Sequence, residues 1–326
     1  MHAMERKALT ANTKKNIRVA ALLTTSMIFV AIAAMIAVIG FSYIGNRNFR
    51  ETFYCTSSLK VNNTIRIIQV SDLHSCTYGT DNSKLMDRVR KLKPDLILYT
   101  GDCVDSTAES IDSVVYMCTE LAKVAPSYYI FGNNEVERYY NDPLTQDSLD
   151  KKFGFDDNNR DPNKLLEMTD TLTEQLEAGG TKVLKNQADT ITIGSTQVDI
   201  YGVLTSNPSS FWSYAGESFD EYIYNDTNNL KITAFHEPTV LEEYSPFSWG
   251  DIMLAGHTHG GTAKIPMLGP VYAHDSGILP ERSGHYIYGR YDVLGRPLIV
   301  SSGLENTNLL RINNEPEIVI VDINRF

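Results

Sequence analysis

A long run without charged side chains constrains this chain more than any other feature of its sequence. From Val19 to Ile44, about 26 residues pass without an Asp, Glu, Lys or Arg. Roughly 20 apolar residues suffice to cross the hydrocarbon core of a bilayer as a helix. A cleaved signal peptide is the alternative, but its apolar region usually runs only about 7–15 residues. The length therefore predicts a retained transmembrane anchor over residues 19–44.

The charges around this run indicate its orientation. Five basic residues precede it and two follow it: Arg6, Lys7, Lys14, Lys15, Arg18, Arg47 and Arg50. Basic residues flanking a membrane span are retained preferentially on the cytoplasmic side. We therefore expect a single-pass protein of the cell membrane. Residues 1–18 form a cytoplasmic basic tail, 45–63 a polar linker, and 64–326 one extracytoplasmic domain.

The extracytoplasmic body is strongly acidic. The whole chain carries a net charge of −11, from 29 basic and 40 acidic residues. Without the seven basic residues and one acidic residue of the first fifty, the rest holds 22 basic against 39 acidic side chains, a net charge of −17. Nonspecific nucleic-acid binding depends on neutralising phosphates with Lys and Arg. The body is therefore not expected to bind nucleic acid, and a small phosphorylated molecule is the better substrate class.

Short β-branched runs alternate with helical patterns in the first half of the body. Strands are expected at 65–70, 96–100 and 128–131, with helices at about 81–92 and 109–124 between them. This alternation predicts an α/β layer. The second half is richer in strands, expected at 191–193, 197–201, 231–235, 252–255, 298–301 and 317–323, with one helix at about 164–178. Together they favour two sheets packed face to face with helices outside.

Polar residues follow the ends of five predicted strands. They form the segments Ser71-Asp72-Leu73-His74, Gly101-Asp102-Cys103-Val104-Asp105, Gly132-Asn133-Asn134-Glu135, His236-Glu237-Pro238 and Gly256-His257-Thr258-His259. Ligands of open α/β sheets bind beyond the carboxyl ends of the strands. Oxygen and imidazole donors together suit Mn, Fe, Zn or similar divalent ions.

This ordered set resembles the calcineurin-like metallophosphoesterase superfamily. The family order is Asp-x-His, Gly-Asp-x-x-Asp, Gly-Asn-His-Glu/Asp, a separate His and Gly-His-x-His. The resemblance runs from about Thr64 to the C-terminal end. With the anchor, it is greatest for the bacterial membrane-anchored, YkuE-like branch, which includes relatives acting on UDP-diacylglucosamine.

The resemblance implies a four-layer α-β-β-α sandwich of two mixed sheets with a dinuclear metal site. By that resemblance, Asp72, His74 and His259 hold one divalent ion, Asn133, His236 and His257 hold the other, and Asp102 bridges both. Manganese is expected first, with Fe, Zn or Mg as alternatives. The activity implied is hydrolysis of a phosphate ester or pyrophosphate by a metal-bound hydroxide, with Asp102, His257 and the residue at position 134 in catalytic roles.

Position 134 departs from the family pattern. The family has a histidine there, which is thought to protonate the leaving group, whereas this chain has Asn134. An amide has no proton to transfer near neutral pH. Three readings remain open. The enzyme acts on a leaving group that needs no acid, such as a nucleotide phosphate; His274 or His285 replaces the acid; or the site binds phosphorylated ligands without turnover.

Other residues near these motifs have less specific expectations. Asp105 is expected to orient a ligand or brace its turn. Cys55, Cys76, Cys103 and Cys118 form either disulfides or unpaired thiols. Two long loops are expected: 141–163, rich in Asp, Asn and Pro, and 205–229, rich in aromatic residues. The aromatic residues either pack locally or contact a nucleobase or acyl chains.

Overall fold

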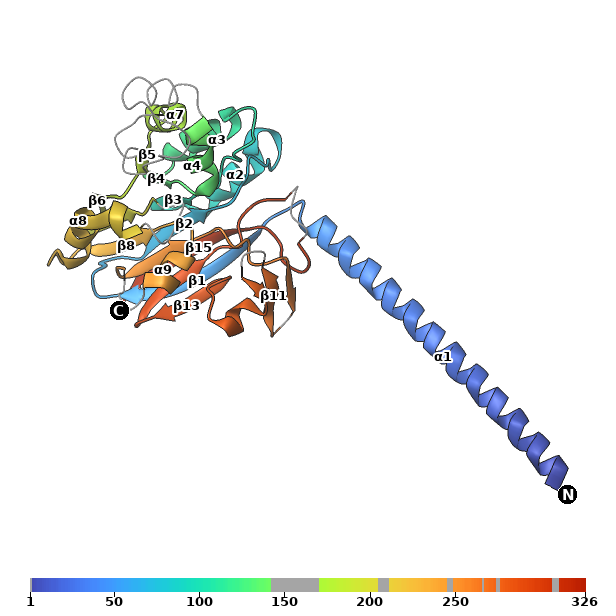
Figure 1. The fold of residues 1–326 in the computed structure, drawn as a ribbon. Helices are drawn as coiled ribbons and strands as arrows, with labels where there is room; N and C mark the ends of the chain where they lie inside the picture. The colour runs from blue at the N-terminus through green and yellow to red at the C-terminus, as the bar shows by residue number, and fades with distance from the viewer. Residues whose placement is uncertain are drawn as a thin grey trace.

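The computed structural model describes residues 2–141, 170–204, 211–244, 249–265, 267–273, 276–306 and 311–326 (Figure 1). Its helices are α1 (His2–Gly45), α2 (Ser83–Leu92), α3 (Asp112–Ala122), α4 (Asn133–Asn141), α7 (Thr171–Ala178), α8 (Phe211–Tyr224) and α9 (Thr239–Tyr244). Two short 3-10 turns, η1 (Thr80–Asn82) and η3 (Pro280–Ser283), supplement them. All described strands follow the long N-terminal helix, as the sequence predicts.

Two six-stranded mixed sheets form the body. The first has the order β1-β15-β2-β3-β4-β5, from β1 (Arg50–Ser58), β15 (Glu317–Arg325), β2 (Ile65–Val70), β3 (Leu96–Thr100), β4 (Ser127–Ile130) and β5 (Thr181–Leu184). The second has the order β13-β14-β9-β8-β7-β6, from β13 (Gly289–Val293), β14 (Arg296–Val300), β9 (Ile252–Ala255), β8 (Leu230–Ala234), β7 (Thr196–Gly202) and β6 (Gln187–Ile193).

Three apolar cores arrange these sheets and the helices into four layers. The core between the sheets includes Ile67 and Leu98 from the first sheet and Ile232 and Leu254 from the second. Alternate residues of the same strands face outward, as the period of a β-strand requires. They pack beneath α2, α3 and α7 on the first sheet, and beneath α8 and α9 on the second. The α-β-β-α sandwich predicted from the sequence is thereby confirmed.

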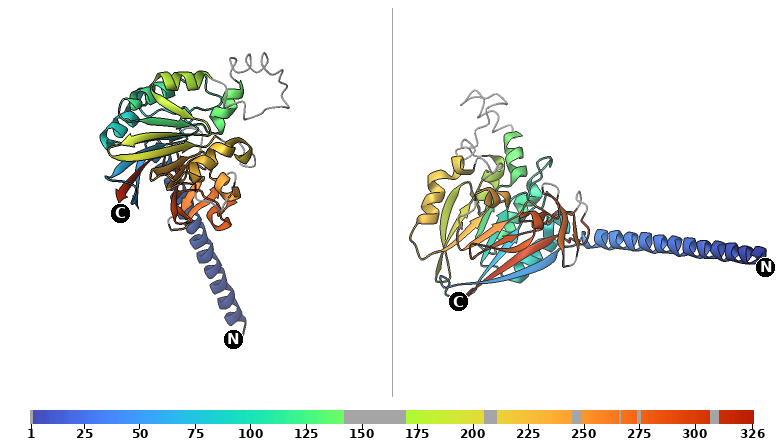
Figure 2. Two further views of the ribbon diagram at one scale, coloured as in Figure 1. Left: turned by 90° about the vertical axis from the view of Figure 1, so that its left-hand side faces the viewer. Right: turned by 60° about the horizontal axis from the view of Figure 1, so that its bottom comes forward.

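A third, three-stranded sheet stands apart from the sandwich. It has the order β10-β11-β12, from β10 (Ala263–Ile265), β11 (Gly269–Ala273) and β12 (Gly277–Ile278). Figure 1 and both views of Figure 2 show it beside the end of α1 where that helix meets the body. These three strands were not predicted from the sequence.

Helix α1 extends away from the body as one continuous rod (Figure 2). Residues Asn16–Gly45 have a mean hydropathy of 2.5 over their most apolar window, and none of that window is buried in the body. An apolar helix of this length in water would expose its whole surface. The segment is therefore a candidate membrane span, and a signal sequence would meet the same criteria of length and composition.

Two segments differ from the sequence-based expectation. Residues 50–58, expected within a linker, form edge strand β1, which pairs in parallel with β15 along its whole length. The expected aromatic loop 205–229 contains helix α8, where Phe219 and Tyr222 are buried against Trp249 and other residues of the outer core. These two aromatic residues thus pack locally. The expected loop at 141–163 lies outside the described residues beyond Asn141.

A buried carboxylate ties the edge strand β1 to its neighbour. The Glu317 side chain on β15 is fully buried and accepts hydrogen bonds from Arg50 and Thr52 on β1. It also accepts the backbone N–H of Ser302 at 2.9 Å. A carboxylate in this position needs such donors, because burying an unpaired charge is costly.

Replacing Glu317 with alanine should therefore lower the free energy of unfolding by about 2–3 kcal/mol, since buried donors lose their acceptor. The measurement is urea denaturation of the full-length chain in detergent. Asp87→Ala is the control, because that exposed carboxylate pairs with Arg90 on the surface of α2 and should cost less than about 0.5 kcal/mol. Equal midpoints for the two variants would contradict the structural role of Glu317.

Candidate active site

Five parallel strands deliver the polar segments predicted from the sequence to one place. In the first sheet, β2, β3 and β4 are adjacent and parallel, and in the second sheet β8 and β9 are. The carboxyl ends of adjacent parallel strands lie at one edge of their sheet. Because the sheets pack face to face, the two edges meet and bring together all seven predicted residues: Asp72, His74, Asp102, Asn133, His236, His257 and His259.

One group combines a carboxylate and two imidazoles from opposite sheets. Asp72 and His74 follow β2, and His259 follows β9. Their donor atoms lie within 4.8 Å of one another. His259 Nε2 is 3.7 Å from Asp72 Oδ1, and the His74 and His259 rings are 5.1 Å apart. These three side chains could hold one cation.

The second group lies beside the first. Asp102, His236 and His257 place their donor atoms within 4.8 Å of one another. His236 Nε2 is 3.2 Å from Asp102 Oδ2, and His257 Nδ1 is 3.0 Å from the side-chain oxygen of Asn133. Asp102 also lies between the groups, since its Oδ2 atom is 3.7 Å from His74 Nε2.

The backbone around these side chains is unusual. Five of the seven residues have positive φ angles between 47° and 72°: Asp72, His74, Asp102, His257 and His259. Non-glycine residues rarely adopt this conformation, and clusters of such residues are typical of functional sites. Hydrogen bonds between the strand ends hold it, including Asp72 N to Gly101 O at 3.0 Å and His74 N to Asp102 O at 2.9 Å.

Two glycines allow these loops to approach one another. A Cβ atom on Gly132 would collide with the Asp102 carboxylate, and one on Gly256 would collide with the side chains of Ser71 and Asp72. The glycines of the Gly-Asn and Gly-His motifs are thus explained by close approach. The carboxylates occupy the space that a side chain would fill.

The charge of the site favours a cation. Asp72 and Asp102 are 0% and 2% exposed. Burial opposes ionisation of Asp102, but neighbouring His236 and His74 and the hydrogen bond from Asn134 hold its pKa below the usual range. Conversely, although burial favours the neutral ring, Asp102 and Asp72 raise the pKa of His236 to about 10. Two buried carboxylates thus require positive charge between them.

The imidazoles are oriented as divalent metal ligands require. His236 Nδ1 lies 2.8 Å from the Thr100 carbonyl oxygen, so donating its proton there leaves Nε2 facing the carboxylates. A backbone carbonyl that orients a histidine in this way is common around metals. His74 Nε2 is buried and has no hydrogen-bond partner among the described residues. A cation beside Asp102 would satisfy it, so the donor set fits a dinuclear metal centre.

Arg311 and Glu305, which were not predicted from the sequence, flank His259. Arg311 is fully buried, and its guanidinium lies 3.3 Å from His259 Nδ1 and donates to the Ser302 carbonyl at 2.7 Å. Glu305 Oε2 is 3.5 Å from the same Nδ1 atom. Burial, followed by the charge of Arg311, lowers the pKa of His259 and keeps the ring neutral. A neutral imidazole is the form that binds metals.

Glu135 supports the Asp102 loop from behind. Its buried carboxylate accepts the backbone N–H groups of Asp102, Val104 and Gly132 at 2.7–2.9 Å, and also the Tyr129 hydroxyl. The sequence shows this glutamate in the motif after β4, but spacing alone gives it no role. The structure assigns it to holding two ligand-bearing turns together.

Asn134, in the first turn of α4, is held by hydrogen bonds on both sides of its side-chain amide. Its side-chain amide donates to Asp102 Oδ2 at 2.7 Å, and its backbone N–H donates to Asp102 Oδ1 at 2.8 Å. Its side-chain oxygen accepts from Ser106 N at 3.1 Å. Asn134 therefore orients the central carboxylate in this structure.

The other residues singled out in the sequence lie in several different environments. Asp105 faces His74, with its Oδ2 atom 3.5 Å from His74 Nδ1, as a ligand-orienting residue would. His285, a candidate acid, lies 2.8 Å from Glu242 on α9. His274 lies outside the described residues. Cys103 and Cys118 are buried free thiols in the core beneath the helices, and burial raises the pKa of both.

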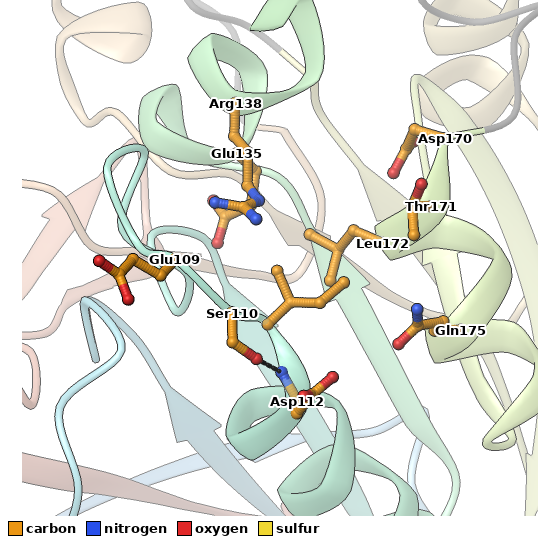
Figure 3. Close-up of a pocket in the computed structure, with 10 residues that line it drawn as sticks. Glu109, Ser110, Asp112, Glu135, Arg138, Asp170, Thr171, Leu172 and Gln175 are labelled. Atoms are coloured by element: carbon orange, nitrogen blue, oxygen red, sulfur yellow. Dashed lines mark hydrogen bonds between the residues drawn. The ribbon is translucent and has the colours of Figure 1, made fainter. Parts of the chain in front are cut away.

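A separate cavity of about 330 Å³ lies on the far side of Glu135. Figure 3 shows its walls, with Glu135 and Arg138 from α4 facing Leu172 at the start of α7, and Ser110 bonded to the backbone of Asp112. The seven predicted residues do not line it. It is therefore distinct from the cluster described above.

The order of these residues and the fold that gathers them define a class of hydrolase. The calcineurin-like phosphoesterase family matches residues 65–261, well over half of the chain. The chain therefore belongs to this family. Members generally use a dinuclear metal site, and the two groups around Asp102 are the candidate ligands for it here.

Bacterial relatives are similar over most of the body. Phosphodiesterase YaeI of Escherichia coli K12 is 25% identical over 262 residues, which cover 79% of this chain and 82% of YaeI. The uncharacterized metallophosphoesterase YkuE of Bacillus subtilis is 26% identical, covering 78% and 77%. UDP-2,3-diacylglucosamine pyrophosphatase LpxG of Chlamydia trachomatis is 22% identical, covering 79% and 83%.

Because Glu135 holds two ligand-bearing turns together, its removal should affect stability and metal binding more than removal of Glu137 on the same helix. Glu135→Ala should lower the free energy of unfolding by about 2–4 kcal/mol, because three buried N–H groups lose their acceptor. It should also reduce the Mn²⁺ bound per chain, as measured by elemental analysis after dialysis.

Glu137→Ala is the matched control, since that side chain is exposed on the same helix and its loss should change stability by less than about 0.5 kcal/mol. Metal content that stays equal in both variants would show that Glu135 does not position the ligand turns.

Proposed function

We propose that this protein is a membrane-anchored, dinuclear-metal phosphoesterase that hydrolyses a phosphodiester or pyrophosphate bond outside the cytoplasm. The observation that carries the proposal is the position of Asp102 between two ligand groups. Its Oδ2 atom lies 3.2 Å from His236 Nε2 and 3.7 Å from His74 Nε2. One carboxylate shared by two groups is the arrangement that a bridged metal pair requires.

The proposed ligands divide between two sites. Asp72, His74 and His259 hold one ion, Asn133, His236 and His257 hold the other, and Asp102 contacts both. Two divalent cations supply electrophilic stabilisation of phosphoryl oxygens and lower the pKa of bound water. Mixed nitrogen and oxygen donors without a thiolate suit Mn, Fe or Zn, and Mg less well. Manganese is proposed first.

The side chains of the site balance the charge of the proposed cations and are held in fixed orientations. Asp72 and Asp102 bring negative charge to hold the cations, while Arg311 adds a buried positive charge behind His259. Fixed charges and dipoles that are already in place stabilise developing charge without reorganisation. The left-handed backbone at the strand ends keeps these side chains pointing inward.

Asn134 favours a leaving group that departs without protonation. Its amide is hydrogen-bonded to Asp102 and cannot transfer a proton near neutral pH. A nucleoside phosphate or another stable anion meets that condition. A pyrophosphate, or a phosphodiester with a stable leaving group, is accordingly favoured over an alkyl ester. The names of LpxG, a pyrophosphatase, and YaeI, a phosphodiesterase, are compatible with this choice.

The membrane location rests on helix α1 and its attachment to the body. Asn46 at its end donates to the Arg311 carbonyl at 3.2 Å, and Asn313 N lies 3.2 Å from Ser42 Oγ. These bonds join the body to the apolar segment itself, which supports a retained anchor over a cleaved signal. The preceding basic residues support a cytoplasmic N-terminus. A lipid-linked or nucleotide-linked envelope phosphate is the proposed substrate class.

Replacing Asp102 with asparagine should remove hydrolytic activity and lower the bound Mn²⁺ from two ions towards one or none per chain. The reason is the loss of the charge shared by both groups. The assay uses the full-length chain in detergent with an aryl phosphodiester, an aryl phosphate and a UDP-linked pyrophosphate. Asp105→Asn, which keeps the direct ligands, should retain both ions. Turnover that persists in Asp102→Asn would refute the proposed site.

A histidine at position 134 would supply the general acid that Asn134 cannot. Asn134→His should raise the rate on an alkyl phosphate relative to an aryl phosphate by at least about 10-fold, because a general acid typically contributes about 10²–10⁴-fold. The wild type should act on the aryl ester or pyrophosphate and hardly on the alkyl ester. Equal wild-type rates on alkyl and aryl esters would contradict the proposed leaving group. No wild-type turnover with metal bound would indicate a phosphate-binding module.

A further inference from the structure

The turn between β10 and β11 exposes large apolar side chains. Met267 is fully exposed, Ile265 is 49% exposed and Leu268 is 38%. These three residues are called the apolar tip below. Scattered exposed apolar residues are common on protein surfaces, but several gathered on one small element mark an interaction surface.

The local fold does not account for the residue types in this tip. The chain turns between β10 and β11, where Leu268 N donates to Ile265 O at 3.0 Å. Met267 in this turn has a φ of 66°, a conformation that favours Gly, Asn or Asp. A fully exposed methionine in that position gains no packing inside the body. Its apolar character therefore points to something outside it.

The tip is fixed beside the end of the anchor. Asn313 links the two, since its backbone N–H donates to Ser42 of α1 at 3.2 Å and its side chain donates to the Lys264 carbonyl at 3.1 Å. Lys264 N in turn donates to Ile312 O at 3.0 Å. Figures 1 and 2 show the small sheet on the side of the body from which α1 leaves.

The end of α1 also indicates where a membrane surface would lie. The Arg47 guanidinium stacks over the Tyr43 ring at 4.8 Å, and both side chains are exposed. Tyrosine and basic residues at the end of a span are typical of the membrane–water interface. The small sheet lies on the side of the body from which α1 leaves, next to this level.

We propose that the apolar tip inserts into the leaflet that α1 enters, as a second contact between the body and the membrane. The inference rests on the membrane anchoring proposed above and adds a fixed orientation to it. With one helix alone, the body can rotate and tilt relative to the membrane. A helix and a separate apolar contact together hold it in one orientation. The partner is the lipid bilayer.

Apolar burial, not charge, drives this contact. The body carries a net charge of −17, so an anionic membrane surface would repel it. Insertion of the tip should therefore occur in neutral phosphatidylcholine, and anionic lipid should not strengthen it. This distinguishes the tip from a basic surface patch.

Docking would also set the height of the active site above the lipid. Strand β10 begins four residues after His259, and Asn314 donates to the carbonyl oxygens of both His259 and Gly261. The small sheet is thus joined to a ligand-bearing loop by a short stretch of chain and, through residues 312–314, by hydrogen bonds. A tip held in the leaflet would keep that loop at a constant distance from phosphates at the membrane surface.

The test uses the full chain at one copy per phosphatidylcholine nanodisc, with an environment-sensitive fluorophore on Met267→Cys in a Cys55→Ser background. Cys76, Cys103 and Cys118 are buried and are not labelled readily. Interfacial elements bury their apolar face about 5–10 Å into the headgroup and acyl boundary, so nitroxide lipids should quench the probe at least about two-fold.

Leu294→Cys is the matched control. Leu294 is also an exposed apolar residue with a positive φ in a hairpin turn, but it lies between β13 and β14. Its neighbours Gly295 and Arg296 share a surface recess with Phe326, and Figure 1 shows the C-terminus far from the end of α1. Its probe should stay unquenched.

The outcomes separate the two proposals. A chain that fails to co-purify with the discs would overturn both anchoring and docking. Co-purification with equal quenching at 267 and 294 would overturn docking and leave anchoring intact. Quenching at 267 that occurs only with two chains per disc would replace lipid with a second copy as the partner. As a further check, Met267→Asp should abolish quenching of a probe on Ile265→Cys.

Discussion

The packing of the two sheets through one apolar interior is the constraint on which the active site depends. Residues such as Ile67 and Leu254 bring the sheets together in register, and the carboxyl ends of five strands then meet. The first sheet supplies all the carboxylates of the cluster and the second supplies three of its four imidazoles. Each group of three therefore draws from both sheets, and neither sheet alone contains a complete set. The packing that stabilises the interior therefore also assembles the site.

Around this cluster, the structure offsets the cost of burying charge with a second ring of polar residues. Glu135, Asn134, Arg311 and Glu305 each contact a proposed ligand or its backbone, and the first three are held by further hydrogen bonds. Such outer contacts orient metal ligands and tune their basicity. Asn134, where a histidine is expected by resemblance, belongs to this ring and not to the proposed ligands. The residues proposed to bind metal and the residues that could donate a proton are thus different, and one set can change without the other.

The local parts of this arrangement are readable from sequence, and the nonlocal parts are not. Strand ends followed by Asp72 or His257 are visible because a β-branched run and a polar turn adjoin in the chain. Strand β1 is invisible in this way, since its mixed residues become a strand only beside β15, whose residues are far away in sequence. Arg311 gives no signal either, because a single arginine far from the motifs reads as a surface residue. The direction of the Asn134 amide depends on Asp102, which spacing alone cannot show.

The pairing of β1 with β15 has a consequence for how the molecule is made. Arg50 and Glu317 are 267 residues apart in the chain, and β15 lies between β1 and β2 in the sheet. During synthesis, β1 emerges just behind α1 and has no neighbour until nearly all the other described strands exist. Unpaired strand edges invite aggregation. These edges stay unpaired until β15, the last described strand, inserts between β1 and β2, the two earliest ones.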